Sequence, residues 1–145
     1  MLSISKYTQD YVDACRSRID SQISAYKDLN KAASDLDPSS EAPLRTAIDT
    51  FEPQFFNHMV LALDNYFCHR ARTIEGKDGN PLNEARVLGN SIMNNGGAMM
   101  ADKTIRLNPA QSVLKYQVGD EIRLDEAQYG ALSRAFFEEI ERRYV

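Results

Sequence analysis

The chain has 145 residues, with 17 Lys and Arg against 21 Asp and Glu, which gives a formal net charge of −4. A chain of this length can bury a core without metals or disulfides, so we expect residues 1–145 to form a single helical domain. The negative charge disfavours nucleic acid as a partner, and no stretch approaches the roughly 18 apolar residues of a membrane span, so we expect no membrane partner either.

Two features predict a cytoplasmic location. The first ten residues lack the apolar stretch of a secretory signal. The two cysteines, Cys15 and Cys68, form no CxxC motif and no Cys/His ligand pattern, which is typical of buried, reduced thiols.

The first half of the chain predicts two long helices. Over residues 6–32 the apolar side chains recur at spacings of three and four, as on one face of a helix. Pro43 suits the first turn of a second helix, and Pro53 is expected to kink it. Residues 53–74 then form the most apolar stretch, whose stripe consists of Phe56, Val60, Leu63, Phe67 and Ile74.

Capping signals define the two remaining helices. Asn80 followed by Pro81 predicts the start of a helix over 81–95, which ends at a run of Asn and Gly. Asp125 and Gln128 have the spacing of a capping box and start the last helix. Its expected buried stripe is Tyr129, Leu132, Phe136, Ile140 and Tyr144.

Residues 104–124 predict a small β excursion before the last helix. Two short strand-like runs, 114–118 and 121–124, flank Gly119-Asp120, which suits a two-residue hairpin turn. The predicted fold is therefore mainly α: an antiparallel bundle of four main helices, the second kinked at Pro53, with a two- or three-stranded antiparallel sheet at about 104–124.

The familiar catalytic signatures are missing from the sequence. It contains no Walker loop, no GxGxxG, no GxSxG and no HExxH motif, so we expect no cofactor and leave open whether the chain is an enzyme. The two histidines, His58 and His69, are eleven residues apart, which is about 16.5 Å along a helix. They cannot share one metal ion on a continuous helix, and we predict no metal site.

One polar constellation stands out on the two central helices. If residues 53–74 and 81–95 pair as antiparallel helices around the 75–80 loop, two polar stripes run side by side. They consist of Asn65, His69 and Arg72 on one helix and Asn83, Arg86 and Asn90 on the other. Asn is a poor residue for a helix interior, so three amides at positions 83, 90 and 94 call for an explanation.

Three interpretations of this polar seam stay open. Both stripes can simply face water, or they can form a buried hydrogen-bonded network that fixes helix register, or they can line a ligand or catalytic pocket. In the last case His69 is the candidate general base, because only histidine titrates near neutrality without perturbation. Arg72 and Arg86 would then clamp an anionic ligand, and the amides of Asn65, Asn83 and Asn90 would orient it.

Asp64 interrupts the apolar run of the second helix and has two interpretations. Its charge is either paired with Arg70 or a residue of the first helix, or it lies on an exposed strip with Asn57 and Ala71.

Two functions of different class follow from these features. The first is self-association, as a homodimer or other homo-oligomer, or binding to another protein, because the chain has long amphipathic helices and no catalytic motif. The second is an anionic small-molecule binder or enzyme that uses the polar seam with His69 as general base.

Overall fold

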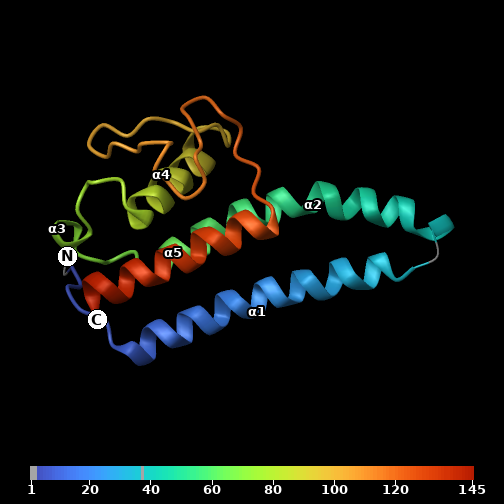
Figure 1. The fold of residues 1–145 in the computed structure, drawn as a ribbon, viewed down its shortest axis with the longest axis horizontal. Coiled ribbons are helices and arrows are strands. Elements are labelled where there is room, and N and C mark those ends of the chain that lie inside the picture. Colours follow the sequence, from blue (N-terminus) through green and yellow to red (C-terminus); the bar gives the residue numbers. More distant parts are fainter. Residues whose placement is uncertain (1–2, 37) are drawn as a thin grey trace.

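The computed structural model describes residues 3–36 and 38–145 and is mainly helical. Five helices pack together: α1 (Gln9–Ser34), α2 (Pro38–Asn65), α3 (Arg72–Glu75), α4 (Pro81–Asn94) and α5 (Glu126–Tyr144). α1 and α2 run side by side, α5 lies along them, and α4 packs against both α2 and α5 (Figure 1). Within the described residues, no helix combines the length and the apolar character needed to cross a bilayer.

The helix starts follow the predicted capping chemistry. The side chain of Asn80 accepts the backbone N–H groups of Leu82 and Asn83, with Pro81 in the first turn of α4. Asp125 and Gln128 form both hydrogen bonds of a capping box at the start of α5. Each cap satisfies backbone donors that have no partner inside the helix.

The core lies where α1, α2, α4 and α5 meet, and the apolar stripes predicted for α2 and α5 supply most of it. Phe67 of the α2 stripe contacts both Phe136 and Phe137 of α5, with ring centroids 5.8 and 6.0 Å apart. All five predicted stripe residues of α5 are buried. Of the five stripe residues predicted over residues 53–74, four are buried and Ile74 is half-buried. The interiors of these helices were therefore predicted correctly from periodicity.

The predicted boundaries of the second helix are wrong at both ends. α2 begins at Pro38 and continues through Pro43 and Pro53 instead of starting near Pro43. It ends at Asn65, so residues 66–71 form turns and a single bridge rather than helix. The reason is long-range pairing: the backbone of residues 69–71 bonds to Ile4, which forms an isolated parallel bridge with Arg70.

The predicted β excursion is also wrong. The described residues contain no strand, and the only pairing after α4 is an isolated bridge between Ala98 and Glu121. A turn forms one residue earlier than predicted, with Val118 and Gly119 at its centre, because the N–H of Asp120 donates to the carbonyl of Gln117. The two flanking runs do not pair with each other, because residues 119–122 bond to the backbone of Gly97 and Met99, and side chains from α2 and α4 bind other backbone groups of the runs.

Asn57 of α2 makes one of these side-chain contacts. Its amide donates to the carbonyl of Ile122 at 2.7 Å and accepts the N–H of Leu124 at 3.1 Å. The side chain thus satisfies the donor and the acceptor that a neighbouring strand would have satisfied.

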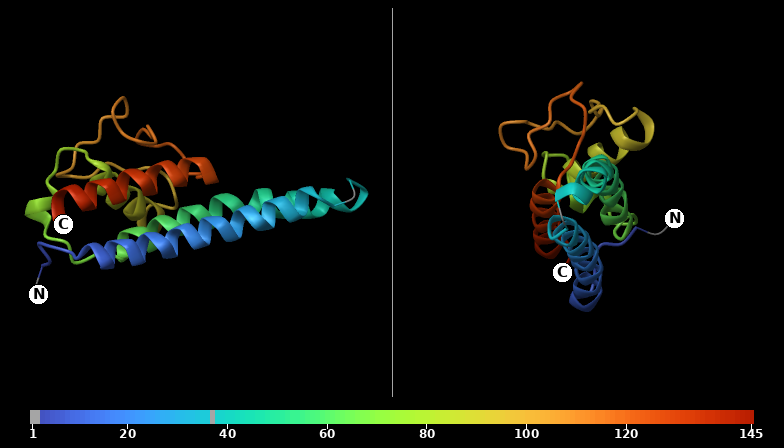
Figure 2. Two further views of the ribbon diagram at one scale, coloured as in Figure 1. Left: turned by 60° about the horizontal axis from the view of Figure 1, so that its bottom comes forward. Right: turned by 90° about the vertical axis from the view of Figure 1, so that its right-hand side faces the viewer.

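α1 and α2 extend beyond the start of α5 (Figures 1 and 2). Lys27 of α1 reaches Glu126, in the first turn of α5, at 3.3 Å, so the parts of α1 and α2 beyond this level have no α5 beside them. We call residues 28–36 and 42–51 the arm. Its own core is small, with Ala33 and Ile48 buried.

Candidate functional site

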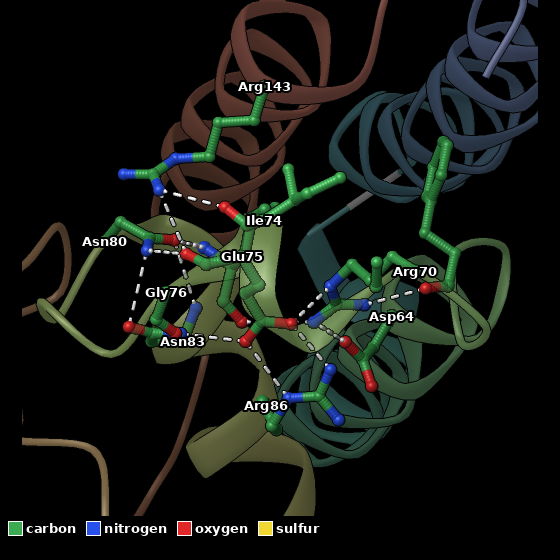
Figure 3. A network of polar contacts seen from close by, with 12 residues as sticks. Asp64, Arg70, Ile74, Glu75, Gly76, Asn80, Asn83, Arg86 and Arg143 are labelled. Atoms are coloured by element: carbon green, nitrogen blue, oxygen red, sulfur yellow. Dashed lines mark hydrogen bonds and ion pairs between the residues drawn. The ribbon is translucent and has the colours of Figure 1, made fainter. Parts of the chain in front are cut away.

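A buried carboxylate organises the region where α2, α3 and α4 meet. Glu75, the last residue of α3, has no solvent exposure. It accepts hydrogen bonds from Arg70 at 2.8 Å, from Arg86 at 2.6 and 3.1 Å, and from the amide of Asn83 at 2.8 Å (Figure 3). Two guanidinium groups and one amide therefore share a single carboxylate.

Arg70 continues the network to α2. Its guanidinium is fully buried and forms an ion pair with Asp64 at 2.8 Å, in addition to the pair with Glu75. It also donates to the carbonyls of Phe67 and Leu82. The structure thus confirms the first interpretation of Asp64, in which its charge is paired with Arg70.

The 75–80 loop is bonded to both sides of this network. Asn80 donates to the carbonyl of Glu75 at 2.8 Å, and Arg143 of α5 donates to the same carbonyl at 3.1 Å. Gly79 has φ of +85°, and a Cβ there would lie 2.8 Å from the carbonyl oxygen of Arg106. Glycine is required at this position by both conformation and space.

Opposing effects set the pKa of Glu75. Burial raises it, but the hydrogen bond from Arg86 and the positive charges of Arg70 and Arg86, together with the Asn83 amide, outweigh burial and hold the pKa below its usual value of 4.5. Glu75 is therefore ionised in the folded protein wherever it is ionised in the unfolded chain.

A groove of about 670 Å³ opens beside this network, between α2 and α4. We call it the seam groove. Its lining contains Leu61, Ala62 and Gly89 from the closest approach of the two helices, where a Cβ on Gly89 would lie 3.3 Å from Leu61. The remaining lining residues are Asp64, Asn65, Arg72, Arg86, Asn90, Met93, Asn94 and Asp102.

Four of the six residues of the predicted polar seam line this groove: Asn65, Arg72, Arg86 and Asn90. Asn83 lies behind it, fully buried against Glu75. His69 does not line it, because α2 ends at Asn65; its side chain is exposed in the following turn and its carbonyl accepts the N–H of Ile4. The seam is thus partly a structural network and partly a groove.

The charges at one end of the groove are balanced. Arg86 is committed to Glu75, and Asp64 to Arg70. The positive charge of Arg72 is one of the causes that lower the pKa of Asp102, after the backbone N–H bonds from Thr104 and Ile105. This end of the groove therefore does not carry the excess positive charge that the predicted clamp for an anionic ligand requires.

Glu75 and Arg70, the two central residues of the network, were not predicted as site residues. Glu75 falls in the expected 75–80 loop. A signal existed in Asp64, whose charge required a partner, and Arg70 was one of the two candidates.

A second buried carboxylate, Glu84 of α4, anchors the segment before α5. It accepts the backbone N–H groups of Val113 and Leu114 at 2.8 and 2.9 Å. Burial raises its pKa, and the two backbone donors offset that effect only in part. Glu84 therefore binds the start of the first predicted strand, at Leu114, to α4.

The α1–α2 pair has an exposed surface on the side away from α5. On α1, Ile23, Ser24 and Lys27 line a groove with α5, whereas Arg18, Ser21 and Gln22 line a different groove with α2. Residues seven apart return to the same side of a helix, so the second side of α1 continues through Leu29, and Leu36 follows just after the end of α1. The same periodicity on α2 connects Leu44, Phe51 and His58.

We call this surface the hairpin face. Its described residues are Tyr11, Ala14, Arg18, Ser21, Gln22, Ala25, Leu29 and Ala32 of α1, Leu36 just after α1, and Pro43, Leu44, Ala47, Phe51, Gln54, Phe55, His58, Ala62 and Asn65 of α2. Arg18 is the one Asp, Glu, Lys or Arg among them, although such residues make up 26% of the chain. Leu29, Leu36 and Phe51 are 43%, 44% and 44% exposed.

Comparison with protein-family models, with curated protein sequences and with solved structures finds no significant match. The described residues also contain no group of three His, Cys, Asp or Glu side chains arranged to hold a metal ion.

Replacement of Glu75 should destabilise the fold strongly. Glu75→Gln leaves the buried guanidinium of Arg70 and that of Arg86 without their shared carboxylate, and breaking such a buried pair costs about 3–5 kcal/mol. Urea unfolding at pH 7 measures the change, with Glu138→Gln, exposed on α5, as control. A loss below about 1 kcal/mol would contradict the role of Glu75.

Because the folded pKa of Glu75 is lowered, its stabilisation is present above the unfolded value of 4.5 and is lost as pH falls through the folded pKa. The free energy of unfolding should therefore fall on acidification in the native chain. That dependence should be weaker in Glu75→Gln.

Glu84 should have the opposite pH dependence. Its folded pKa is raised, so its contribution to stability is fully present below 4.5 and is lost as pH rises through the folded pKa. Glu84→Gln removes this dependence. It also costs about 1–3 kcal/mol at pH 5, since one amide oxygen cannot accept both backbone donors equally.

Hydrogen exchange locates this effect. The amides of Val113 and Leu114 should exchange faster in Glu84→Gln than in the native chain, whereas Glu138→Gln should leave their exchange unchanged. Unchanged protection in Glu84→Gln would show that the carboxylate does not hold the segment.

Proposed function

We propose that this protein acts by helix-mediated self-association, in which a second copy of the chain covers the hairpin face. The observation that carries the proposal is the loss of charge along an exposed helical surface. Charged side chains are abundant on the other exposed sides of α1, at Asp13, Asp20, Lys27, Asp28 and Lys31, but not on this one. Depletion of charge combined with exposed Leu and Phe is typical of the centre of a protein interface.

The size of the surface supports a stable complex. α1 has 26 residues and is therefore about 39 Å long, and two helices packed 8–10 Å apart present a surface about 18 Å wide. This corresponds to roughly 700 Å² per partner, or about 1,400 Å² in total, within the range of standard specific interfaces.

The occupant favoured by the charge pattern is a second copy. Two chains of net charge −4 repel each other through most of their surfaces. The hairpin face is where two copies approach without like charges in contact, apart from Arg18. Its seven-residue repeats also suit the packing of one helical hairpin on another, as in four-helix bundles.

The oligomeric state and two charge insertions test this function. Sedimentation velocity of the native chain should give twice the chain mass of 16.4 kDa. Leu29→Glu and Phe51→Glu should each weaken the dimer by more than about tenfold, because a two-fold interface buries each new charge twice.

Ser24→Glu is the matched control, since it adds the same charge to α1 on the side that faces the α5 groove. It should leave the dimer intact. Circular dichroism of all three variants verifies that the helices are retained. A native chain that is monomeric at concentrations of tens of micromolar, or equal weakening by Ser24→Glu, would refute the proposal.

A second candidate function is ligand binding in the seam groove, favoured by the amides and apolar surface gathered there. The balanced charge at its end suits a ligand that both donates and accepts hydrogen bonds more than the anionic ligand predicted from sequence. The catalytic role predicted for His69 receives no support from the lining of the groove.

Native mass spectrometry of the purified protein tests this candidate. A bound ligand adds mass to the chain, and Asn90→Leu or Arg72→Ala should remove that mass because both side chains are exposed in the groove. His69→Ala, exposed outside the groove, should retain it. Mass that survives the first two substitutions would place the ligand elsewhere.

A further inference from the structure

We infer that the two copies pair with their α1–α2 hairpins antiparallel. The arm of each copy then covers the body of the other, where the body is the part of the chain outside the arm. This inference rests on the proposed self-association and specifies its geometry. It follows from the unequal shape of the two halves of the hairpin face and from the position of its one charge.

The half of the hairpin face beside the body is hollow. A groove of about 580 Å³ runs between α1 and α2 there. Its lining is mostly small or polar on the α1 side, with Ser17, Ser21 and Gln22, and is closed by Met59 and Ala62 of α2 and by Tyr66, the residue after α2. Arg18 lies over the ring of Tyr66, 5.8 Å from its centroid.

The half of the hairpin face on the arm carries the projecting side chains. Leu29 stands out from α1, Leu36 stands out just after it, and Phe51 stands out from α2 with its ring stacked on Phe55 at 5.3 Å. No α5 lies beside this part of the hairpin, because α5 begins at the level of Lys27. The arm is therefore the less supported half and has the larger apolar side chains to bury.

Only one of the two symmetric arrangements brings these halves together. A two-fold axis perpendicular to the helices, near residue 25 of α1, places Leu29 opposite the partner's Ser21 and Gln22. The projecting side chains of each arm then face the hollow half of the other copy, and the two-fold axis makes this contact twice. In a parallel pair, projecting side chains would oppose each other and the two hollows would face each other, which leaves voids that cost dispersion energy.

The charge on the hairpin face favours the same arrangement. In a parallel pair the two Arg18 side chains would lie at the same level of the interface, with no carboxylate of the partner's α1 C-terminus near either of them. In the antiparallel pair each Arg18 lies opposite Ala32 of the other copy, between Asp28 and Asp35 and near the C-terminal end of α1. Carboxylates and the carbonyl end of a helix both attract a guanidinium.

The arrangement also supports the arm. The arm buries Ala33 and Ile48 between its two helices and leaves Leu29, Leu36 and Phe51 exposed in one copy. In the antiparallel pair these exposed side chains rest on α1 and α2 of the partner's body. The dimer is then a four-helix layer at its centre, with α5 of each copy on the outside.

Spin-label distances distinguish the two arrangements. In a Cys68→Ser background, nitroxide labels are attached singly at Asp10→Cys or Ser34→Cys, both exposed and outside the hairpin face. Double electron–electron resonance is recorded on each labelled chain and on a 1:1 mixture of the two. Cys15 is buried, so it is not expected to take up label.

The antiparallel pair predicts a long distance between identical sites and a short one between different sites. At 1.5 Å per residue about a centre near residue 25, two labels at position 10 are offset along the helix by about 45 Å, and labels at positions 10 and 34 by about 9 Å. A parallel pair reverses this order, with no offset between identical sites and about 36 Å between different ones.

The outcomes separate this inference from the proposed function. Long same-site and short mixed-site distances support the antiparallel pair. The reverse order overturns it while self-association stands. The lack of any intermolecular distance, together with a monomeric mass in sedimentation, overturns both.

Discussion

The shared carboxylate of Glu75 is the contact on which the tertiary structure most depends. It joins Arg70 after α2, Arg86 of α4 and Asn83 in the first turn of α4, and its backbone carbonyl is bonded to Arg143 of α5. Without that charge Arg86 would lose its carboxylate partner, and the buried Arg70 would keep only Asp64. The orientation of α4 against α2, and with it the shape of the seam groove, depends on this one residue.

Side chains also replace regular secondary structure in the segment between α4 and α5. Asn57 and Glu84, from two different helices, bind backbone groups of this segment, and the hydroxyl of Ser91 accepts the N–H of Met100. A connection of this length is uncommon without strands or helices of its own. Here its backbone groups are satisfied by the helical body, which explains why a strand pair is not needed.

The two surfaces of the molecule differ in the kind of contact that they can make. The seam groove combines amides with balanced charges, so it suits a polar ligand of no net charge. The hairpin face is long, nearly free of charge and apolar on the arm, so it suits another helical surface. Ala62 of α2 lines both the seam groove and the groove between α1 and α2. The two grooves are therefore neighbours, with this small side chain between them.

The sequence by itself determined the local features of this protein. The stripes of α1, α2 and α5, the cap at Asn80 and the capping box at Asp125 follow from contacts within a few residues, and periodicity or capping chemistry is sufficient to predict them. The four amides and arginines that line the seam groove were also found this way, since residues on one stripe of a helix stay together.

Only the tertiary structure decided the features that depend on distant partners. The end of α2 at Asn65 is set by pairing of the next residues with Ile4, and this moved His69 away from the groove. The first predicted strand loses the N–H of Leu114 to Glu84, 30 residues earlier in the chain, and the N–H of Ile122 in the second strand donates to Gly97. The pairing of Glu75 with Arg70 and Arg86 likewise depends on how α2 and α4 are rotated about their axes, and a pattern within one helix carries no information about that rotation.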